Sequence, residues 1–271
     1  MTADSHIVLE RVSHTYRTAS GPLPVLDDLS ISIPKSAFCA VVGPSGCGKS
    51  TLTRLIAGLM IPDEGRVTLA GDIIRTPRPT VGMAFQNPVL LEWRTILQNV
   101  LLPLEIVKNT LSQSQRVARA EELLALVGLS GFEGKRPSEL SGGMRQRASL
   151  CRALVHRPEV LILDEPFGAL DAFTREDLWK TMHDLRHQEA FTCLLITHDL
   201  REAVFLADEV VVLSGRPATV QKSVAVPLGR DRDLHDLYTP EITHVLSDLR
   251  DQIEIAQGRA IPEPARGGDP S

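Results

Sequence analysis

Nine residues, GPSGCGKST at 43–51, have the spacing of a phosphate-binding loop. They follow the apolar run FCAVV and precede a helical pattern, which is the context that this motif requires. Glycines let the backbone curve around phosphate oxygens, while the lysine adds a positive charge and a hydroxyl can bind Mg²⁺. We therefore assign contacts with ATP and Mg²⁺ to Gly43, Pro44, Ser45, Gly46, Cys47, Gly48, Lys49, Ser50 and Thr51.

Two carboxylates follow a second apolar run, VLILDEP at 160–166. Asp164 ends the expected strand, where it can hold Mg²⁺ through water. Glu165 comes next and is a candidate to orient or deprotonate an attacking water. A solvated turn is the alternative for such a pair, but the phosphate loop in the same chain favours the catalytic interpretation.

His198 and Gln86 are further candidates, because His198 follows an expected strand and Gln86 follows the apolar run VGMAF in a similar way. Groups at the carboxyl ends of parallel strands converge on the ligand. His198 is interpreted as a sensor of the γ-phosphate, and Gln86 as a group that reaches the metal or the water. The alternatives are a structural histidine and a surface glutamine in the turn before Pro88.

A second turn of small residues lies in SELSGGMRQRAS at 138–149, before an amphipathic helical pattern. Ser141, Gly142 and Gly143 would let a phosphate approach the start of that helix, although an ordinary N-cap is the alternative. A phosphate loop alone leaves the γ-phosphate solvated on one side. We therefore expect this turn to serve a second copy of the chain, arranged head-to-tail.

The apolar pattern predicts an α/β fold with a mainly parallel sheet. Four almost wholly apolar runs, at 38–43, 160–164, 193–197 and 209–214, fit strands buried on both faces, and alternating runs at 6–16, 25–33 and 65–71 fit strands with one solvated face. Helical patterns lie between them, at 48–59, 113–127, 142–156, 174–188 and 199–206.

The expected domain covers residues 1–258. A mostly helical block at about 88–157 is interpreted as an inserted subdomain, and 215–258 as a C-terminal extension. The Pro/Gly-rich end of the chain, 259–271, is expected to be disordered.

Composition narrows the possible partners of the chain. The 271 residues carry a formal net charge of −5, so no overall positive field attracts nucleic acid. The four cysteines lack CxxC spacing and are expected to be reduced thiols. The N-terminus has no signal-peptide pattern, and no run approaches the ~18 apolar residues of a spanning helix. We expect any membrane role to come through partners.

Residues 6–215 resemble ATPases of ABC transporters. LSGGMRQR at 140–147 is similar to their signature motif, and the phosphate loop, Gln86, VLILDEP, GALDA at 168–172 and His198 follow the family's order. The resemblance implies a RecA-like P-loop NTPase core with an N-terminal antiparallel β subdomain and an inserted helical subdomain. It implies a homodimer in which Ser141, Gly142 and Gly143 contact the partner's ATP. Asp171 would link the two sites, and Tyr16 matches the aromatic residue that stacks on adenine.

A narrower resemblance, to importers of nitrate, aliphatic sulfonates and taurine, is carried by residues 86–105, 163–179 and 216–233. It implies two copies of a transmembrane permease, indirect work with a solute-binding protein, and a peripheral location on the cytoplasmic face of the bacterial inner membrane. The chain departs from that group at two places. Glu92 stands where the group usually has the proline of Leu-Pro-Trp, and Ser36-Ala37 stands where it usually has Gly-Glu.

Three alternatives stay open from the sequence. They are an ATPase for export or lipid transport, a soluble ABC ATPase acting on nucleic acid or ribosomes, and a nucleotide kinase. The kinase leaves LSGGMRQR unexplained, and the chain has neither the long coiled-coil insertions nor the tandem cassettes of the soluble class.

Overall fold

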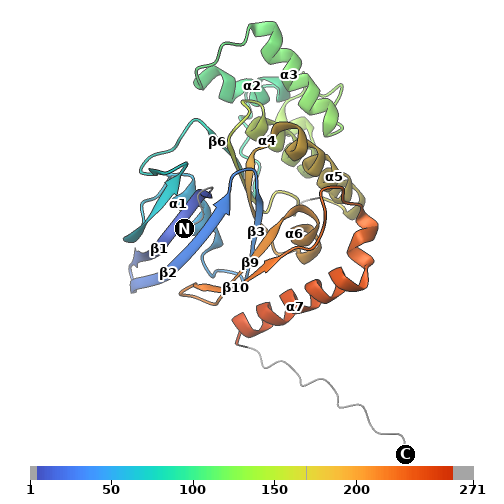
Figure 1. Cartoon of the computed structure of the whole chain (residues 1–271). Helices are drawn as coiled ribbons and strands as arrows, with labels where there is room; N and C mark the ends of the chain where they lie inside the picture. Colours follow the sequence, from blue (N-terminus) through green and yellow to red (C-terminus); the bar gives the residue numbers. More distant parts are fainter. Residues whose placement is uncertain (1–4, 169, 259–271) are drawn as a thin grey trace, which may run out of the picture.

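The computed structural model describes residues 5–168 and 170–258 as an α/β fold with two sheets (Figure 1). The central sheet has the strand order β10-β9-β3-β8-β7-β6, and all its pairs are parallel except β10 with β9. Its strands are β3 (Phe38–Val42), β6 (Val81–Ala84), β7 (Val160–Asp164), β8 (Thr192–Ile196), β9 (Glu209–Leu213) and β10 (Val220–Ala225). The predicted α/β class and mainly parallel sheet are confirmed.

The second sheet is antiparallel and has the order β2-β1-β4-β5. Its strands are β1 (Ser5–Thr18), β2 (Gly21–Pro34), β4 (Glu64–Leu69) and β5 (Asp72–Ile73). Every second residue along much of β1 and β2 is buried, as the alternating pattern predicts. Those buried residues share one apolar core with β3 and α1, so the sheet is fixed against the central layer.

Helices cover the central sheet and extend beyond one end of it (Figure 1). They are α1 (Lys49–Ile56), α2 (Ile96–Ile106), α3 (Gln113–Leu126), α4 (Gly142–Leu154), α5 (Ala172–Glu189), α6 (Leu200–Leu206) and α7 (Pro240–Ala256), with short 3₁₀ turns η1 (Pro137–Glu139) and η2 (Leu234–Tyr238). The five predicted helical patterns correspond to α1, α3, α4, α5 and α6. Within residues 5–168 and 170–258, every helix is too short or too polar to cross a lipid bilayer.

The helical block consists of α2, α3 and α4; α2 and α3 are shown in green at the top of Figure 1, and α4 lies below them. Asn99 is fully buried and holds the loop before α2: its amide oxygen accepts from Leu91 N at 2.7 Å, and its amide nitrogen donates to the carbonyls of Leu91 and Thr95 at 3.1 and 3.0 Å. Thr95 caps α2. These contacts fix the path of the segment that follows Gln86.

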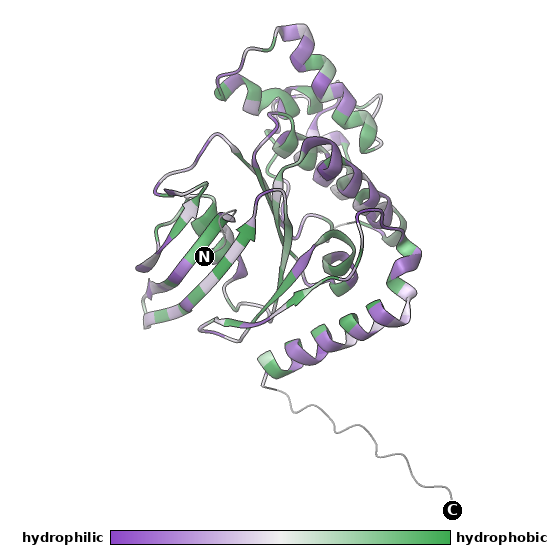
Figure 2. Cartoon of the chain, in the orientation of Figure 1, coloured by the Kyte–Doolittle hydropathy of each residue, from purple (hydrophilic) through white to green (hydrophobic). Residues whose placement is uncertain are grey.

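The C-terminal extension is folded onto the central sheet by α7. Ile242 and Leu249 of α7 are buried, and Lys222 Nζ of β10 lies 2.8 Å from both carboxylate oxygens of Asp248. Figure 2 shows apolar and polar residues alternating along α7, as an amphipathic helix requires. The predicted disordered tail lies outside the described residues.

Ser36 occupies the turn before β3, where the resemblance described above leads us to expect glycine. Its φ of +59° is a left-handed conformation that L-residues rarely adopt. The Ser36 amide donates to Thr192 Oγ1 at 2.9 Å, and its hydroxyl donates to Ala190 O at 2.8 Å. These two bonds stabilise the turn without glycine.

All four cysteines are buried and carry free thiols: Cys39, Cys47, Cys151 and Cys193. Burial raises the pKa of each.

Candidate functional site

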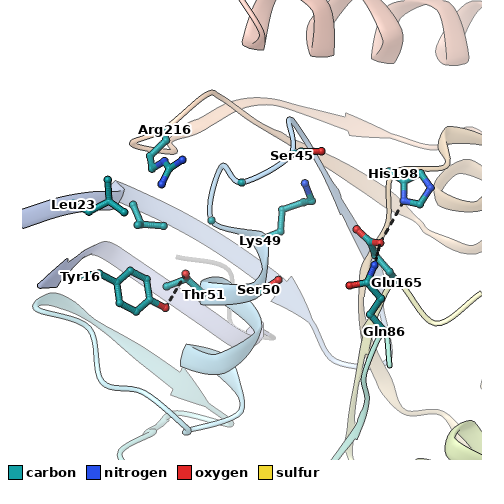
Figure 3. A pocket seen from close by; sticks show the side chains of 13 residues that line it. Tyr16, Leu23, Ser45, Lys49, Ser50, Thr51, Gln86, Glu165, His198 and Arg216 are labelled. Atoms are coloured by element: carbon teal, nitrogen blue, oxygen red, sulfur yellow. Dashed lines mark hydrogen bonds and ion pairs between the residues drawn. The ribbon is translucent and has the colours of Figure 1, made fainter. Parts of the chain in front are cut away.

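A pocket of about 630 Å³ opens at the carboxyl edge of the central sheet, facing the antiparallel sheet (Figure 3). Most of its lining comes from turns that follow parallel strands, because such strands deliver their carboxyl ends to one edge. The lining residues are Tyr16, Leu23, Val25, Ser45, Gly46, Gly48, Lys49, Ser50, Thr51, Gln86, Glu165, His198 and Arg216.

The turn between β3 and α1 forms the floor of the pocket. Gly48 precedes α1 with φ +127°, and a Cβ there would lie 2.8 Å from Val25 Cγ1, so this position needs glycine. No side chain caps the start of α1. The amides at this helix N-terminus are therefore available to an anion, which the helix dipole also favours.

Lys49 lies along the inside of this turn. It is only 8% exposed, and its Nζ donates to Gly43 O at 2.8 Å and to Pro44 O at 2.9 Å. The lysine charge is thus held at the centre of the loop. Gly43, Pro44 and Cys47, also predicted as ligands, are not among the lining residues; Cys47 is 1% exposed and belongs to the core.

Three predicted polar residues meet on the opposite wall of the pocket. Gln86 Nε2 donates to Glu165 Oε2 at 2.8 Å, and His198 Nδ1 lies 3.5 Å from the same oxygen. They follow β6, β7 and β8, which are neighbours in the sheet, so the expected convergence occurs. The Glu165 side chain is 23% exposed and that of His198 is 69% exposed, so water can reach both.

Glu165 has an unusual backbone. Its φ is +49°, which costs about 1–2 kcal/mol for an L-residue. A hydrogen bond of 2.9 Å from Glu165 N to Ile196 O holds it in place. Residues kept in such conformations cluster at functional sites, and here the turn aims the carboxylate into the pocket.

Asp164 and Ser50 provide oxygen donors beside the phosphate loop. Burial raises the pKa of Asp164, and the neighbouring Glu165 charge raises it further, whereas a hydrogen bond with the Ser50 side chain acts in the opposite direction. Asp164 does not line the pocket, but Ser50 does. A hydroxyl, a carboxylate and the Gln86 amide oxygen form the hard oxygen set that Mg²⁺ prefers, and the set fits that ion.

Tyr16 stands at the other end of the pocket, beside Leu23 and Val25. Its hydroxyl lies 3.2 Å from Thr51 Oγ1, and its ring meets His14 edge-on at 5.0 Å. The ring is therefore fixed next to an apolar wall, as a site for a flat aromatic base requires. No sequence motif marks Leu23, Val25 or Arg216 as residues that line this pocket.

The second small-residue turn lies elsewhere. Ser141 caps α4, with its Oγ accepting from Met144 N at 3.2 Å, and neither it nor Gly142 nor Gly143 lines the pocket. Ser141 and Gly142 are exposed. One turn further into α4, Gln146 is buried and donates to Phe85 O at 3.0 Å. This bond ties α4 to the residue before Gln86.

Asp171 caps α5, accepting a 3.0 Å hydrogen bond from Thr174 N, and this bond lowers its pKa. It is exposed and lies outside the pocket. Arg175, one turn later, donates to Leu170 O and to Asp199 Oδ2, both at 3.0 Å. Arg175 therefore joins the turn of Asp171 to the turn of His198.

Comparison with known proteins identifies the family. The sequence model of the ABC transporter family matches residues 26–168. The chain belongs to the ABC transporter family. A bicarbonate transport ATP-binding protein of Synechocystis is 43% identical over 228 residues, which are 84% of this chain and 81% of that protein. The predicted family and enzyme class, an ATP hydrolase of the ABC-transporter type, are confirmed.

Two further relatives belong to the same group. A nitrate import ATP-binding protein of Synechococcus elongatus is 43% identical, covering 82% of this chain and 81% of the relative. A taurine import ATP-binding protein of Pseudomonas entomophila is 44% identical, covering 82% and 84%. The predicted resemblance to nitrate and taurine importers is confirmed, and bicarbonate transport joins that group.

A solved structure supports the fold and the assembly. The ATP-binding cassette MJ0796, as a dimer in a post-hydrolysis state bound to ADP and Pi, superposes with a TM-score of 0.75 at 28% identity. The match covers 82% of this chain and 100% of the cassette. The predicted P-loop NTPase fold is confirmed, and the dimeric cassette supports homodimerisation.

Proposed function

We propose that this chain is the ATP-hydrolysing subunit of an importer for a small anion, and that two copies close head-to-tail on two Mg-ATP. One observation supports the assembly above all: the pocket contains the phosphate loop, while Ser141, Gly142 and Gly143 lie at an exposed helix start outside it. A second copy can bring these residues to the open side of the nucleotide.

In this proposal the pocket orients ATP along its length. Tyr16 stacks on adenine, and the loop around Lys49 binds the phosphates. Mg²⁺ would be held by Ser50 and the phosphates, and by Asp164 and Gln86 through water; when bound it neutralises phosphate charge. Its affinity depends on an ionised Asp164.

Glu165 is assigned the role of base. Its carboxylate accepts a hydrogen bond from Gln86, which fixes its orientation, and His198 Nδ1 lies 3.5 Å from the same oxygen. Glu165 takes a proton from the water that attacks the γ-phosphorus, the bond from that phosphorus to the bridging oxygen breaks, and ADP leaves. His198 donates a hydrogen bond to the γ-phosphate. Such stabilisation needs donors aimed at the charge before the reaction starts.

A test of the paired site uses two defective chains. Lys49→Ala removes the loop charge, and Ser141→Arg blocks the signature turn. Each alone should be inactive. Mixed at equal amounts, they should recover about a quarter of wild-type turnover, because half of the randomly formed pairs contain one intact site of two. A mixture as inactive as its components would refute the shared site.

The permease contact is proposed for the groove beside α2. A cavity of about 290 Å³ lies between β6, α2 and α4, and its largely apolar lining includes Met83, Leu102 and Ile106. On the segment after Gln86, Val89 and Trp93 are 60% and 72% exposed. Such an apolar surface suits a short helix of a transmembrane permease. The protein would then be peripheral on the cytoplasmic face of the bacterial inner membrane.

The solute is proposed to be a small anion such as nitrate, bicarbonate, taurine or an aliphatic sulfonate, by similarity to the relatives above. Selectivity would lie in the permease and in a solute-binding protein. Reconstitution with the neighbouring permease should give ATP hydrolysis stimulated by the loaded binding protein. Stimulation by nucleic acid or ribosomes instead would favour the soluble class, and transport outward would favour an exporter.

A further inference from the structure

Arg216 lies on the pocket wall although no motif predicts it there. It belongs to the loop between β9 and β10, and a Cβ at Gly46 would lie 3.7 Å from its Nη2. In Figure 3 its side chain lies on the same side of the phosphate loop as Tyr16 and Leu23, opposite Gln86, Glu165 and His198. Its guanidinium thus stands between the base end of the pocket and the phosphate loop.

The loop that carries Arg216 is fixed from both sides. Ser214 and Thr219 close it, with Ser214 N donating to Thr219 O at 3.0 Å and Thr219 N donating to Ser214 Oγ at 2.9 Å. Ala218 joins it to β2: its amide donates to Val25 O at 2.8 Å, and its carbonyl accepts from Asp27 N at 3.0 Å. The backbone is therefore anchored, while the exposed Arg216 side chain can meet a ligand.

The charges around the pocket favour an anion at this point. The lining contains two permanent cations, Lys49 and Arg216, and one carboxylate, Glu165, which lies on the far wall. Burial raises the pKa of the Cys47 thiol under the loop, and the charges of Lys49 and Arg216 both oppose that shift, so the field of Arg216 reaches the loop. Two like charges on one pocket repel until an anion lies between them.

We propose that Arg216 is a nucleotide-binding residue that contacts the phosphate chain of ATP and ADP at its base-proximal end. This inference depends on the nucleotide site proposed above. ATP and ADP share the base-proximal phosphates, so Arg216 contributes equally to the binding of both nucleotides. It does not take part in the chemical step. A contact of this kind changes Kd and KM but leaves kcat unchanged.

The test compares Arg216→Gln and Arg216→Lys with wild type, by titration of the full-length protein with ATP and with ADP. Arg216→Gln should weaken both nucleotides by the same factor, about tenfold, with kcat preserved. Arg216→Lys keeps the charge and should recover most of the affinity. The deficit of Arg216→Gln should shrink as salt rises, because salt screens an exposed contact.

Two controls separate the possible failures. Arg250→Gln removes an exposed arginine of α7 outside the pocket and should bind like wild type. Lys49→Ala should lose nucleotide binding; if it still binds, the proposed site itself is wrong. If Lys49→Ala fails to bind but Arg216→Gln retains wild-type Kd, or loses kcat alone, or loses ATP but not ADP affinity, the role of Arg216 is refuted.

Discussion

Gln86 donates a 2.8 Å hydrogen bond to Glu165, and this bond joins the turns after β6 and β7 on the pocket wall opposite the phosphate loop. Gln86 also begins the segment that carries the exposed Trp93, and Gln146 of α4 holds the residue just before it. A displacement of that segment or of α4 therefore reaches the carboxylate directly. The relationship gives a physical route between the proposed permease contact and Glu165, the proposed base.

Gln86→Ala should slow ATP turnover about tenfold while leaving the Kd for ATP in the absence of Mg²⁺ unchanged. The variant removes a hydrogen bond to a charged group, which is worth roughly 1.5–3 kcal/mol, and leaves the phosphate loop intact. Steady-state phosphate release and equilibrium titration measure the two quantities. Asn87→Ala, an exposed neighbour outside the pocket lining, is the control. Equal turnover of the two variants would remove Gln86 from this role.

Glu165→Gln should lower the rate of ATP turnover by ~10²–10⁴-fold and trap a dimer that holds ATP. The amide keeps the size and polarity of the side chain but is not a base. In size-exclusion chromatography the variant should elute as a dimer with Mg-ATP and as a monomer when nucleotide is left out. Hydrolysis near the wild-type rate would exclude Glu165 as the base.

The buried Glu202 should make the stability of the folded protein depend on pH. It is 3% exposed beside Asp199 and the buried Trp179, and burial, reinforced by the Asp199 charge, raises its pKa to about 8. In the unfolded chain a glutamate has a pKa of roughly 4.3, so the folded state holds the proton more tightly. Its contribution to stability is therefore complete at acid pH and is lost as the pH rises toward 8.

Glu202→Gln keeps a neutral side chain at every pH and should escape that loss. Its Tm should exceed that of wild type by an amount that grows between about pH 5 and pH 8 and then levels off, reaching several degrees. Thermal melts across that range are compared with Glu241→Gln, at an exposed position of α7. Melting curves whose separation is constant with pH would contradict the assignment.

Arg119 of α3 and Glu189 at the end of α5 form a largely buried ion pair between the helical block and α5, with side chains 8% and 13% exposed. Arg119→Met should cost about 3–5 kcal/mol, because it leaves the Glu189 carboxylate buried without a partner. Replacing both residues by Met should restore most of that loss. Urea unfolding of the four forms gives the coupling free energy.

The exposed pair Arg66 and Glu10 provides the comparison, with side chains 56% and 44% exposed. Arg66→Met should change the free energy of unfolding by no more than about 1 kcal/mol, because water screens this pair. If the double variant of the buried pair unfolds as readily as Arg119→Met alone, the ion pair does not couple the two parts.

The sequence by itself determined the features that depend on neighbouring residues. The spacing of GPSGCGKST, with glycine where φ is positive, defines the phosphate loop before any fold is known. Continuous apolar runs identified β3, β7, β8 and β9, since strands buried on both faces need no polar side. The N-cap at Ser141, which the sequence analysis gave as the alternative to a phosphate contact, is also local, because a capping hydroxyl reaches an amide three residues ahead.

Weak local patterns left several elements out of the predicted strands and helices. β6 has only four residues, and β10 is an edge strand that carries the polar residues Gln221 and Lys222. α7 mixes apolar and polar residues, and no sequence motif marks it. Edge strands tolerate polar residues because one side of the strand has no neighbour. β6 is formed by pairing with β7, β10 is formed by pairing with β9, and α7 is held by packing against the central sheet.

Only the tertiary structure decided which distant residues share the pocket. Arg216 reaches Gly46 because β9 lies beside β3, and Gln86 reaches Glu165 because β6 lies beside β7. These neighbours are 170 and 79 positions apart in the chain. Strand order is set by the burial of side chains from the whole sheet, a property that no short stretch of sequence contains.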